Sequence, residues 1–294
     1  MLCLQVVSFL NPALQDLLVI LPRWLYLDLV GRLLSEPPLP PPYIRYDENG
    51  CAEREVVVKM FADVHPEIEG EFVLKMLAER GLVVTRDSDK KVMALFKLTA
   101  KRPIEVWPVP EQEGVTMFYM GRRKIYSKAA GISLALFPLL QWHLYNLFLK
   151  EEGAEMPMWK DGIRVVSSLY KAEAIVERRP EIQAVDVIAR GHIATDCQHL
   201  MHKLLVETMA MADEMSPGSR LQHFYLSLNE LRKHSSSGSP DAPKVQYAQA
   251  RVEQACSKCT FVTDDKGAYP EDLTDLFLLP EEGGGKFSFE LVVC

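Results

Sequence analysis

Two groups of side chains in this sequence have the types and spacing that chemistry requires. His199 and His202 are three residues apart in a predicted helix, and His192 lies just upstream of them. Cys256 and Cys259 form a C-x-x-C pair. Imidazole and thiolate are ligands that zinc prefers, and a C-x-x-C pair can also carry out disulfide exchange. These residues raise the hypothesis of a metal- or thiol-dependent enzyme.

Neither group has the partners that this chemistry needs. A structural zinc site takes four ligands, and no second pair of Cys or His stands at a fitting spacing from Cys256 and Cys259. His199 and His202 fall on the polar face of their helix, with no Cys or carboxylate in register. The sequence therefore favours two ordinary thiols and two solvated histidines, and it predicts no metal site and no cofactor.

Motifs for nucleotide binding or hydrolysis are also incomplete. Gly285-Lys286 is the nearest approach to a phosphate-binding loop, but Phe287 follows where a Ser or Thr would hold magnesium. The sequence contains neither a G-x-S-x-G elbow nor an H-E-x-x-H motif. Since no nucleophile can be paired with a base, we expect no catalysis by this chain alone.

The composition limits the class of protein. The chain has 294 residues, of which 48% are hydrophobic and 25% charged, as in ordinary globular domains, and its length allows two of them. A net charge of −7 argues against a nucleic-acid surface. Its six Cys show no disulfide-framework spacing, which favours a reduced, cytoplasmic location.

Residues 156–191 organise the elements that would position any site. Lys160-Asp161-Gly162 predicts a tight turn between apolar runs. Apolar and polar residues then alternate, and Arg179-Pro180-Glu181 interrupts the alternation before it resumes. The pattern predicts a half-buried antiparallel meander of three strands, which needs an apolar cover over one face.

Two predicted helices flank this meander and can cover it. The helix after it carries apolar or small residues at helical spacing over 197–212, and the helix before it spans 132–150. Residues 129–149 lack a formal charge and are long enough to cross a bilayer, so a membrane-associated protein is the first alternative function. Pro138 and Gln141 would be costly in lipid, which favours a helix in a protein core.

The N-terminal part divides into helices, a linker and a compact unit. Residues 1–35 read as helices rich in Leu and Trp, and the proline-rich stretch 36–42 reads as a stiff spacer. Residues 43–108 predict two helices followed by two strands, at 54–61, 66–80, 82–85 and 92–96, which is a winged-helix order. The second helix is net acidic, so we expect protein contact rather than DNA binding.

The remaining chain predicts an α/β subdomain over 114–280 and a disordered tail over 281–294. Its first element is a strand hairpin over 116–126, with Gly121 at the bend. The predicted fold class is α+β: an N-terminal helical, winged-helix subdomain precedes an α/β subdomain whose meander is covered by helices.

Several segments resemble the COR domain of Roco-family proteins. Trp159-Lys160-Asp161-Gly162-Ile163 and Val185–Gly191 resemble the end of that domain, and Phe137-Pro138-Leu139-Leu140-Gln141 resembles its Phe-Pro helix start. Leu21–Leu25 and Val30–Ser35 resemble the start of the COR region in the death-associated protein kinase branch. The resemblance covers roughly residues 20–280.

The resemblance implies a function through partners. In that family COR follows a Ras-like GTPase domain, Roc, and acts as its coupling and dimerisation half. It implies a non-catalytic regulatory and scaffolding module that forms homodimers and contacts a Roc domain. The sequence itself has no phosphate loop, so GTP binding is not carried over to any residue. The expected interaction residues are Trp24, Leu25, Phe137, Leu140 and Trp159.

Overall fold

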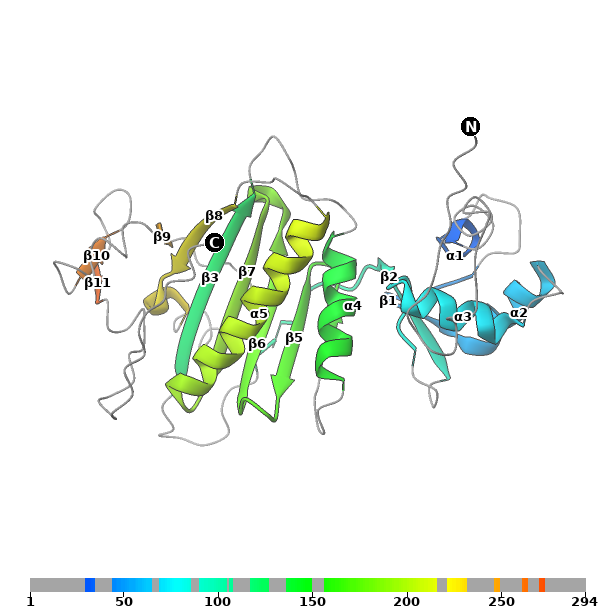
Figure 1. Ribbon diagram of the computed structural model, residues 1–294, viewed down its shortest axis with the longest axis horizontal. Coiled ribbons are helices and arrows are strands. Elements are labelled where there is room, and N and C mark those ends of the chain that lie inside the picture. The colour runs from blue at the N-terminus through cyan, green and yellow to red at the C-terminus, as the bar shows by residue number, and fades with distance from the viewer. Residues whose placement is uncertain are drawn as a thin grey trace.

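The chain has an α+β fold with a small helix-rich unit beside a large antiparallel sheet (Figure 1). The computed structural model describes residues 30–34, 44–64, 69–85, 90–104, 106–107, 117–126, 136–149, 156–215, 221–231, 246–248, 261–263 and 270–272. The predicted interaction residues Trp24 and Leu25, the Cys256/Cys259 pair and the predicted tail 281–294 lie outside these ranges.

The small unit packs three helices on a two-stranded sheet. Its elements are α1 (Gly31–Leu34), β1 (Asn49–Glu53), α2 (Arg54–Val64), α3 (Gly70–Glu79) and β2 (Lys91–Leu98). β1 and β2 are antiparallel, and Val84 forms an isolated bridge with Met93. Phe61, Leu77 and Val83 are fully buried at the centre of the unit. Both predicted helices and the second predicted strand are present, while the winged-helix class stays a prediction.

The large sheet has seven strands in the order β4-β5-β6-β7-β3-β8-β9, and every pairing is antiparallel. The strands are β3 (Phe118–Tyr126), β4 (Met158–Trp159), β5 (Gly162–Ser167), β6 (Ala172–Arg179), β7 (Ala184–Gly191), β8 (Leu221–Leu226) and β9 (Gln246–Ala248). The short helix η2 (Pro180–Ile182) joins β6 to β7, and β10 (Phe261–Thr263) pairs with β11 (Pro270–Asp272) separately. The predicted meander is confirmed as β5-β6-β7, and β4 extends it by one short strand.

The hairpin predicted over 116–126 is wrong. Residues 118–126 form one continuous strand, β3, which lies between β7 and β8 and pairs with both. Gly121 lies in the middle of this strand, where a Cβ atom would come within 2.8 Å of the Leu226 Cβ. The glycine therefore permits close packing between strand and neighbour, and it does not mark a bend.

Helices α4 (Leu136–Phe148) and α5 (Ala194–Met215) cover one face of the sheet, as predicted (Figure 1). Their buried side chains form one core with the inward residues of the strands: Phe137, Leu140, Leu144, Leu200, Leu204, Ile163, Val165, Val176 and Val187. The two helices also meet through the His143 Nε2 and Glu207 Oε2 atoms at 2.6 Å. Burial opposes ionisation of Glu207, but Lys203 and His143 hold the pKa of its carboxyl below the usual value.

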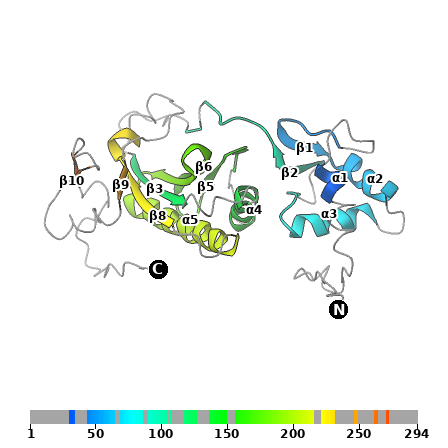
Figure 2. The ribbon, with the colours of Figure 1, turned by 90° about the horizontal axis from the view of Figure 1, so that it is seen from above.

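The prediction of a half-buried meander is wrong, because the second face of the sheet is covered as well. Every residue of β7 is buried, and Ile175 and Ile188 on the second face are 1% and 6% exposed. The segment that follows β2 crosses this face, opposite α4 and α5 (Figure 2). From it, Val106 packs on Ile175, and Trp107 stacks with Tyr119 at 5.9 Å between ring centroids.

The small unit and the sheet meet through α4. Tyr145 forms a small buried cluster with Val84 and Leu95 of the small unit. The segment after β2 adds a backbone hydrogen bond, in which the Lys160 N–H donates to the Ala100 carbonyl at 2.9 Å. The contact between the two units is therefore partly apolar and partly made by the connecting backbone.

The β4–β5 turn is held from α4 by one buried amide. The Gln141 side chain is fully buried, and its Nε2 donates to the carbonyls of Trp159 and Gly162 at 2.8 and 2.9 Å. This polar residue of α4 thus faces the turn backbone.

The membrane alternative rested on the apolar stretch 129–149. Within the described residues, no helix is long and apolar enough to cross a membrane.

The Trp159 indole lies directly over Gly162, its cross-strand partner. A Cβ atom on Gly162 would be 2.0 Å from the Trp159 Cε2 and Cζ2 atoms.

We predict that Gly162→Ala lowers the free energy of unfolding by about 3 kcal/mol or more, the upper range for overpacking. Urea unfolding followed by far-UV circular dichroism measures this change. Lys160→Ala, in the same turn but exposed, is the control and should change it by less than about 0.5 kcal/mol; equal effects of both variants would contradict this packing.

Candidate functional site: a buried charge network across the sheet

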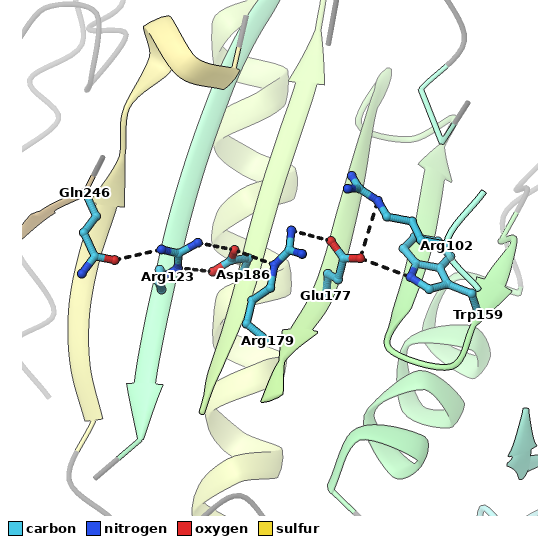
Figure 3. A network of polar contacts seen from close by, with 7 residues as sticks. All are labelled: Arg102, Arg123, Trp159, Glu177, Arg179, Asp186 and Gln246. Carbon is cyan, nitrogen blue, oxygen red and sulfur yellow. Dashed lines mark hydrogen bonds and ion pairs between the residues drawn. The ribbon is translucent and has the colours of Figure 1, made fainter. Parts of the chain in front are cut away.

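A row of charged side chains crosses the sheet on the face opposite α4 and α5 (Figure 3). Arg123 of β3 is the cross-strand partner of Asp186 of β7, and Asp186 is the partner of Glu177 of β6. Directly paired residues of antiparallel strands project to the same face. The register alone therefore brings a cation and two carboxylates side by side on three neighbouring strands.

Asp186 is the centre of this network. Its carboxylate is fully buried and accepts two hydrogen bonds from the Arg123 guanidinium, at 2.6 Å from Nε and 2.7 Å from Nη2. The Arg179 Nε donates to the same carboxylate at 3.2 Å. A bidentate arginine satisfies both oxygens of a carboxylate, which is the geometry that makes a buried ion pair tolerable.

Glu177 is buried at the next position of the row and is held less completely. The Arg179 Nη2 lies 2.7 Å from its Oε2, the Arg102 Nε lies 3.5 Å from its Oε1, and the Trp159 Nε1 donates to Oε1 at 3.3 Å. Burial nevertheless raises the pKa of Glu177 above its ordinary value, against the opposing effects of Arg179 and Arg102. Folding therefore favours the neutral, protonated form of the Glu177 carboxyl more than the unfolded chain does.

The two ends of the network lie outside the meander. Arg102 comes from the segment after β2, so its contact with Glu177 ties that segment to β6. Gln246 comes from β9, and its Oε1 accepts a hydrogen bond from the Arg123 Nη1 at 3.0 Å. The network therefore joins the connecting segment, the three central strands and an outer strand (Figure 3).

A second row of charges runs parallel to the first on the same face. Glu173 of β6 lies between Arg164 of β5, at 2.6 Å, and Arg190 of β7. The Arg190 guanidinium also lies over the Trp107 ring, 4.4 Å from its centroid. This cation–π contact joins the second row to the connecting segment, as Arg102 does for the first.

These rows can bind structure together, but they do not form an acid–base site. Asp186, Glu177 and Glu173 are each held by two arginines, so none of them is positioned to take a proton from a substrate. The chemistry available here is electrostatic attachment of one segment to another.

The three described members of the predicted interaction set are core residues. Phe137 and Leu140 are each 1% exposed and pack between α4 and the sheet, while Trp159 is 2% exposed and covers Gly162. Their apolar area is used within the chain because the sheet needs it as cover. Only Trp159 reaches the charge network, through its donor to Glu177.

The histidines of the metal hypothesis are placed on the surface. His199 and His202 are exposed on α5, and no group of three metal-ligating side chains occurs within the described part of the chain. Cys197, at the start of the same helix, is buried, and burial raises the pKa of its thiol to about 12. That thiol is held in the protonated, unreactive form at neutral pH.

The charge network itself was missed by the sequence analysis. Glu177 and Asp186 occupy polar positions between apolar residues, and Arg123 lies in a run of three basic residues; a pattern analysis assigns both kinds of position to solvent. Opposite charges on strands that pair directly are the one available signal. That signal could not be used because β3 precedes β7 by a long stretch of chain, and its register is not encoded locally.

Comparisons with known proteins add no relative. No protein-family model matches this chain, and no curated protein matches it.

The two buried carboxylates should respond differently to neutralisation. Asp186→Asn leaves Arg123 buried without an anion, while Arg179 keeps Glu177, and we predict a loss of about 3–5 kcal/mol in the free energy of unfolding at pH 7. Glu177→Gln imitates the neutral form that burial already favours, so we predict a change below about 1 kcal/mol. Urea unfolding measures both. Asp161→Asn, which breaks the partly exposed pair with Arg178, is the control and should cost less than about 1 kcal/mol.

The pH dependence separates these two carboxylates further. Because the pKa of Glu177 is raised in the folded chain, its stabilising contribution is present below the ordinary value of 4.5 and is lost as pH rises through the raised value. Glu177→Gln should remove this loss of stability above pH 4.5. An identical pH profile for the wild type and Glu177→Gln would contradict the assignment.

Proposed function

We propose that this chain is a non-catalytic regulatory and scaffolding module of the COR type found in Roco proteins, which acts in the cytoplasm. In this proposal it forms a homodimer and contacts a Ras-like GTPase domain. The observation that carries the proposal is the use of the buried charges: each carboxylate on the second sheet face is held by arginines of the same chain. Such an arrangement supports a role in holding and coupling segments.

The position of the connecting segment supports a coupling role in particular. This segment leads from the small unit to the sheet, and it is fixed on the sheet by Arg102 on Glu177 and by Trp107 beneath Arg190. A partner that moves the small unit would therefore strain contacts on three central strands. Two packed units with a fixed connector are the physical requirement for passing a change at one surface to another.

Association is tested with the purified chain alone. Light scattering after size exclusion, over a range from about 1 to 50 μM, should show a mass that rises with concentration, because dimerisation follows mass action. The same sample is titrated with a Ras-like GTPase domain of the Roc type, loaded with GDP or with a GTP analogue. A chain that stays monomeric and binds neither form of that domain would overturn the proposal.

Four exposed apolar side chains in different segments of the chain allow the contact to be located. Ile104, Leu169, Ile193 and Val206 are 83%, 70%, 52% and 48% exposed. We predict that changing one of them to Asp weakens dimerisation or GTPase binding by about tenfold or more, because binding energy concentrates in few residues. The variants at the other surfaces serve as matched controls, and unchanged affinity in all four would exclude these surfaces from the contact.

A further inference from the structure

A cluster of basic side chains lies on the other face of the sheet, at its β3–β8 side. Arg122 and Lys124 of β3 are the cross-strand partners of Tyr225 and His223 of β8. All four side chains therefore project to the same face as α5. This cluster shares no residue with the charge network, because neighbouring positions along a strand point to opposite faces.

The side chains of the cluster are in contact in two pairs. The Lys124 Nζ contacts the His223 Nδ1 directly, and the Arg122 guanidinium lies over the Tyr225 ring, 3.6 Å from its centroid. Lys124 is buried, with 7% of its surface exposed, while Arg122 and His223 are partly exposed. Solvent thus reaches the cluster along Arg122 and His223.

This cluster lacks the balancing carboxylates that the charge network has. Among the described residues, no Asp or Glu lies within ion-pair distance of Arg122 or Lys124. The Asp213 carboxylate of α5 instead raises the pKa of Tyr126, in addition to the effect of burial. Burial and the neighbouring Arg122 lower the pKa of Lys124 to about 8. Burial and Lys124 lower the pKa of His223 as well. The two like charges that act on each other are therefore Arg122 and Lys124. Partly or fully buried cations with no carboxylate partner are costly unless an anion compensates them.

We propose that Arg122, Lys124 and His223 form a binding site for a phosphate group. A guanidinium, an ammonium and an imidazolium supply charged donors from two adjacent strands, and a doubly charged phosphate can accept from all of them at once. The Tyr225 ring packs against one face of the Arg122 guanidinium in a cation–π contact. A singly charged carboxylate would balance only part of this charge.

Phosphate binding should draw protons onto the protein. An anion beside Lys124 and His223 favours their charged forms, so both groups hold protons more tightly in the complex than in the free chain. Affinity is therefore highest near pH 7 and falls as pH rises through about 8, where free Lys124 loses its charge. The charged group that acts on Lys124 is Arg122 of β3, which in turn contacts Tyr225 of β8. Asp213 of α5 acts on Tyr126 of β3.

The test is calorimetric titration of the full chain with inorganic phosphate at constant ionic strength, at pH 7.0 and 9.5. Sulfate is titrated in parallel, because it remains a dianion at both pH values and so isolates the protonation of the protein. We expect saturable binding at pH 7.0, an affinity at least about tenfold lower at pH 9.5 for both anions, and proton uptake in buffers of different ionisation enthalpy. Phenyl phosphate in place of phosphate distinguishes a phosphomonoester ligand from the free ion.

Lys124→Met removes the ammonium while keeping an apolar stem of similar length. We expect it to weaken phosphate binding at pH 7.0 by at least about tenfold and to keep or raise the melting temperature without phosphate, since it removes a buried ammonium that has no carboxylate partner. Lys124→Arg should retain binding. Lys160→Met, at an exposed Lys in the β4–β5 turn, is the matched control and should bind phosphate as the wild type does.

Three results would overturn the proposal. These are absence of saturable phosphate binding by the wild type at pH 7.0, equal affinity of the wild type and Lys124→Met, or an affinity for sulfate that does not change with pH. If Lys124→Met does not fold, His223→Gln provides the comparison, and an unchanged affinity and proton uptake in that variant would count against the site in the same way.

Discussion

The contact on which the second face of the sheet depends is the bidentate pair between Arg123 and Asp186. Asp186 is fully buried in the centre of a seven-stranded sheet, where an unpaired carboxylate would be prohibitive. Arg123 satisfies both of its oxygens and also reaches Gln246 of β9. Once this pair is in place, Arg179 can join Asp186 to Glu177, and Arg102 can bring the connecting segment onto the sheet.

The two faces of the sheet are held by different physical means. On one face α4 and α5 cover the strands through an apolar core, and the Gln141 amide holds the β4–β5 turn. On the other face, aromatic and aliphatic side chains of the connecting segment are interleaved with paired charges. The apolar face supplies most of the stabilisation by burial, while the charged face specifies where the connecting segment must lie.

Local patterns in the sequence predicted the elements well, and long-range pairing was where prediction failed. Asp161-Gly162 and the apolar spacing from Cys197 to Ala212 are local signals, and both the turn and the helix are confirmed. Gly121 was assigned to a bend because a glycine in a strand suggests one locally, but its role is set by Leu226, far along the chain. The pair between Arg123 and Asp186 was not predicted, because it depends on a register between β3 and β7 that no local pattern encodes.

The central claim is that the buried network is a single coupled unit that holds the chain together, with Arg123 and Asp186 as its core. A double-mutant cycle tests it most directly: Arg123→Gln, Asp186→Asn and the double variant are compared by urea unfolding at pH 7. The account predicts a coupling free energy of about 2–3 kcal/mol, because each single change leaves the other partner's charge buried. Additivity of the two changes to within about 0.5 kcal/mol would contradict it.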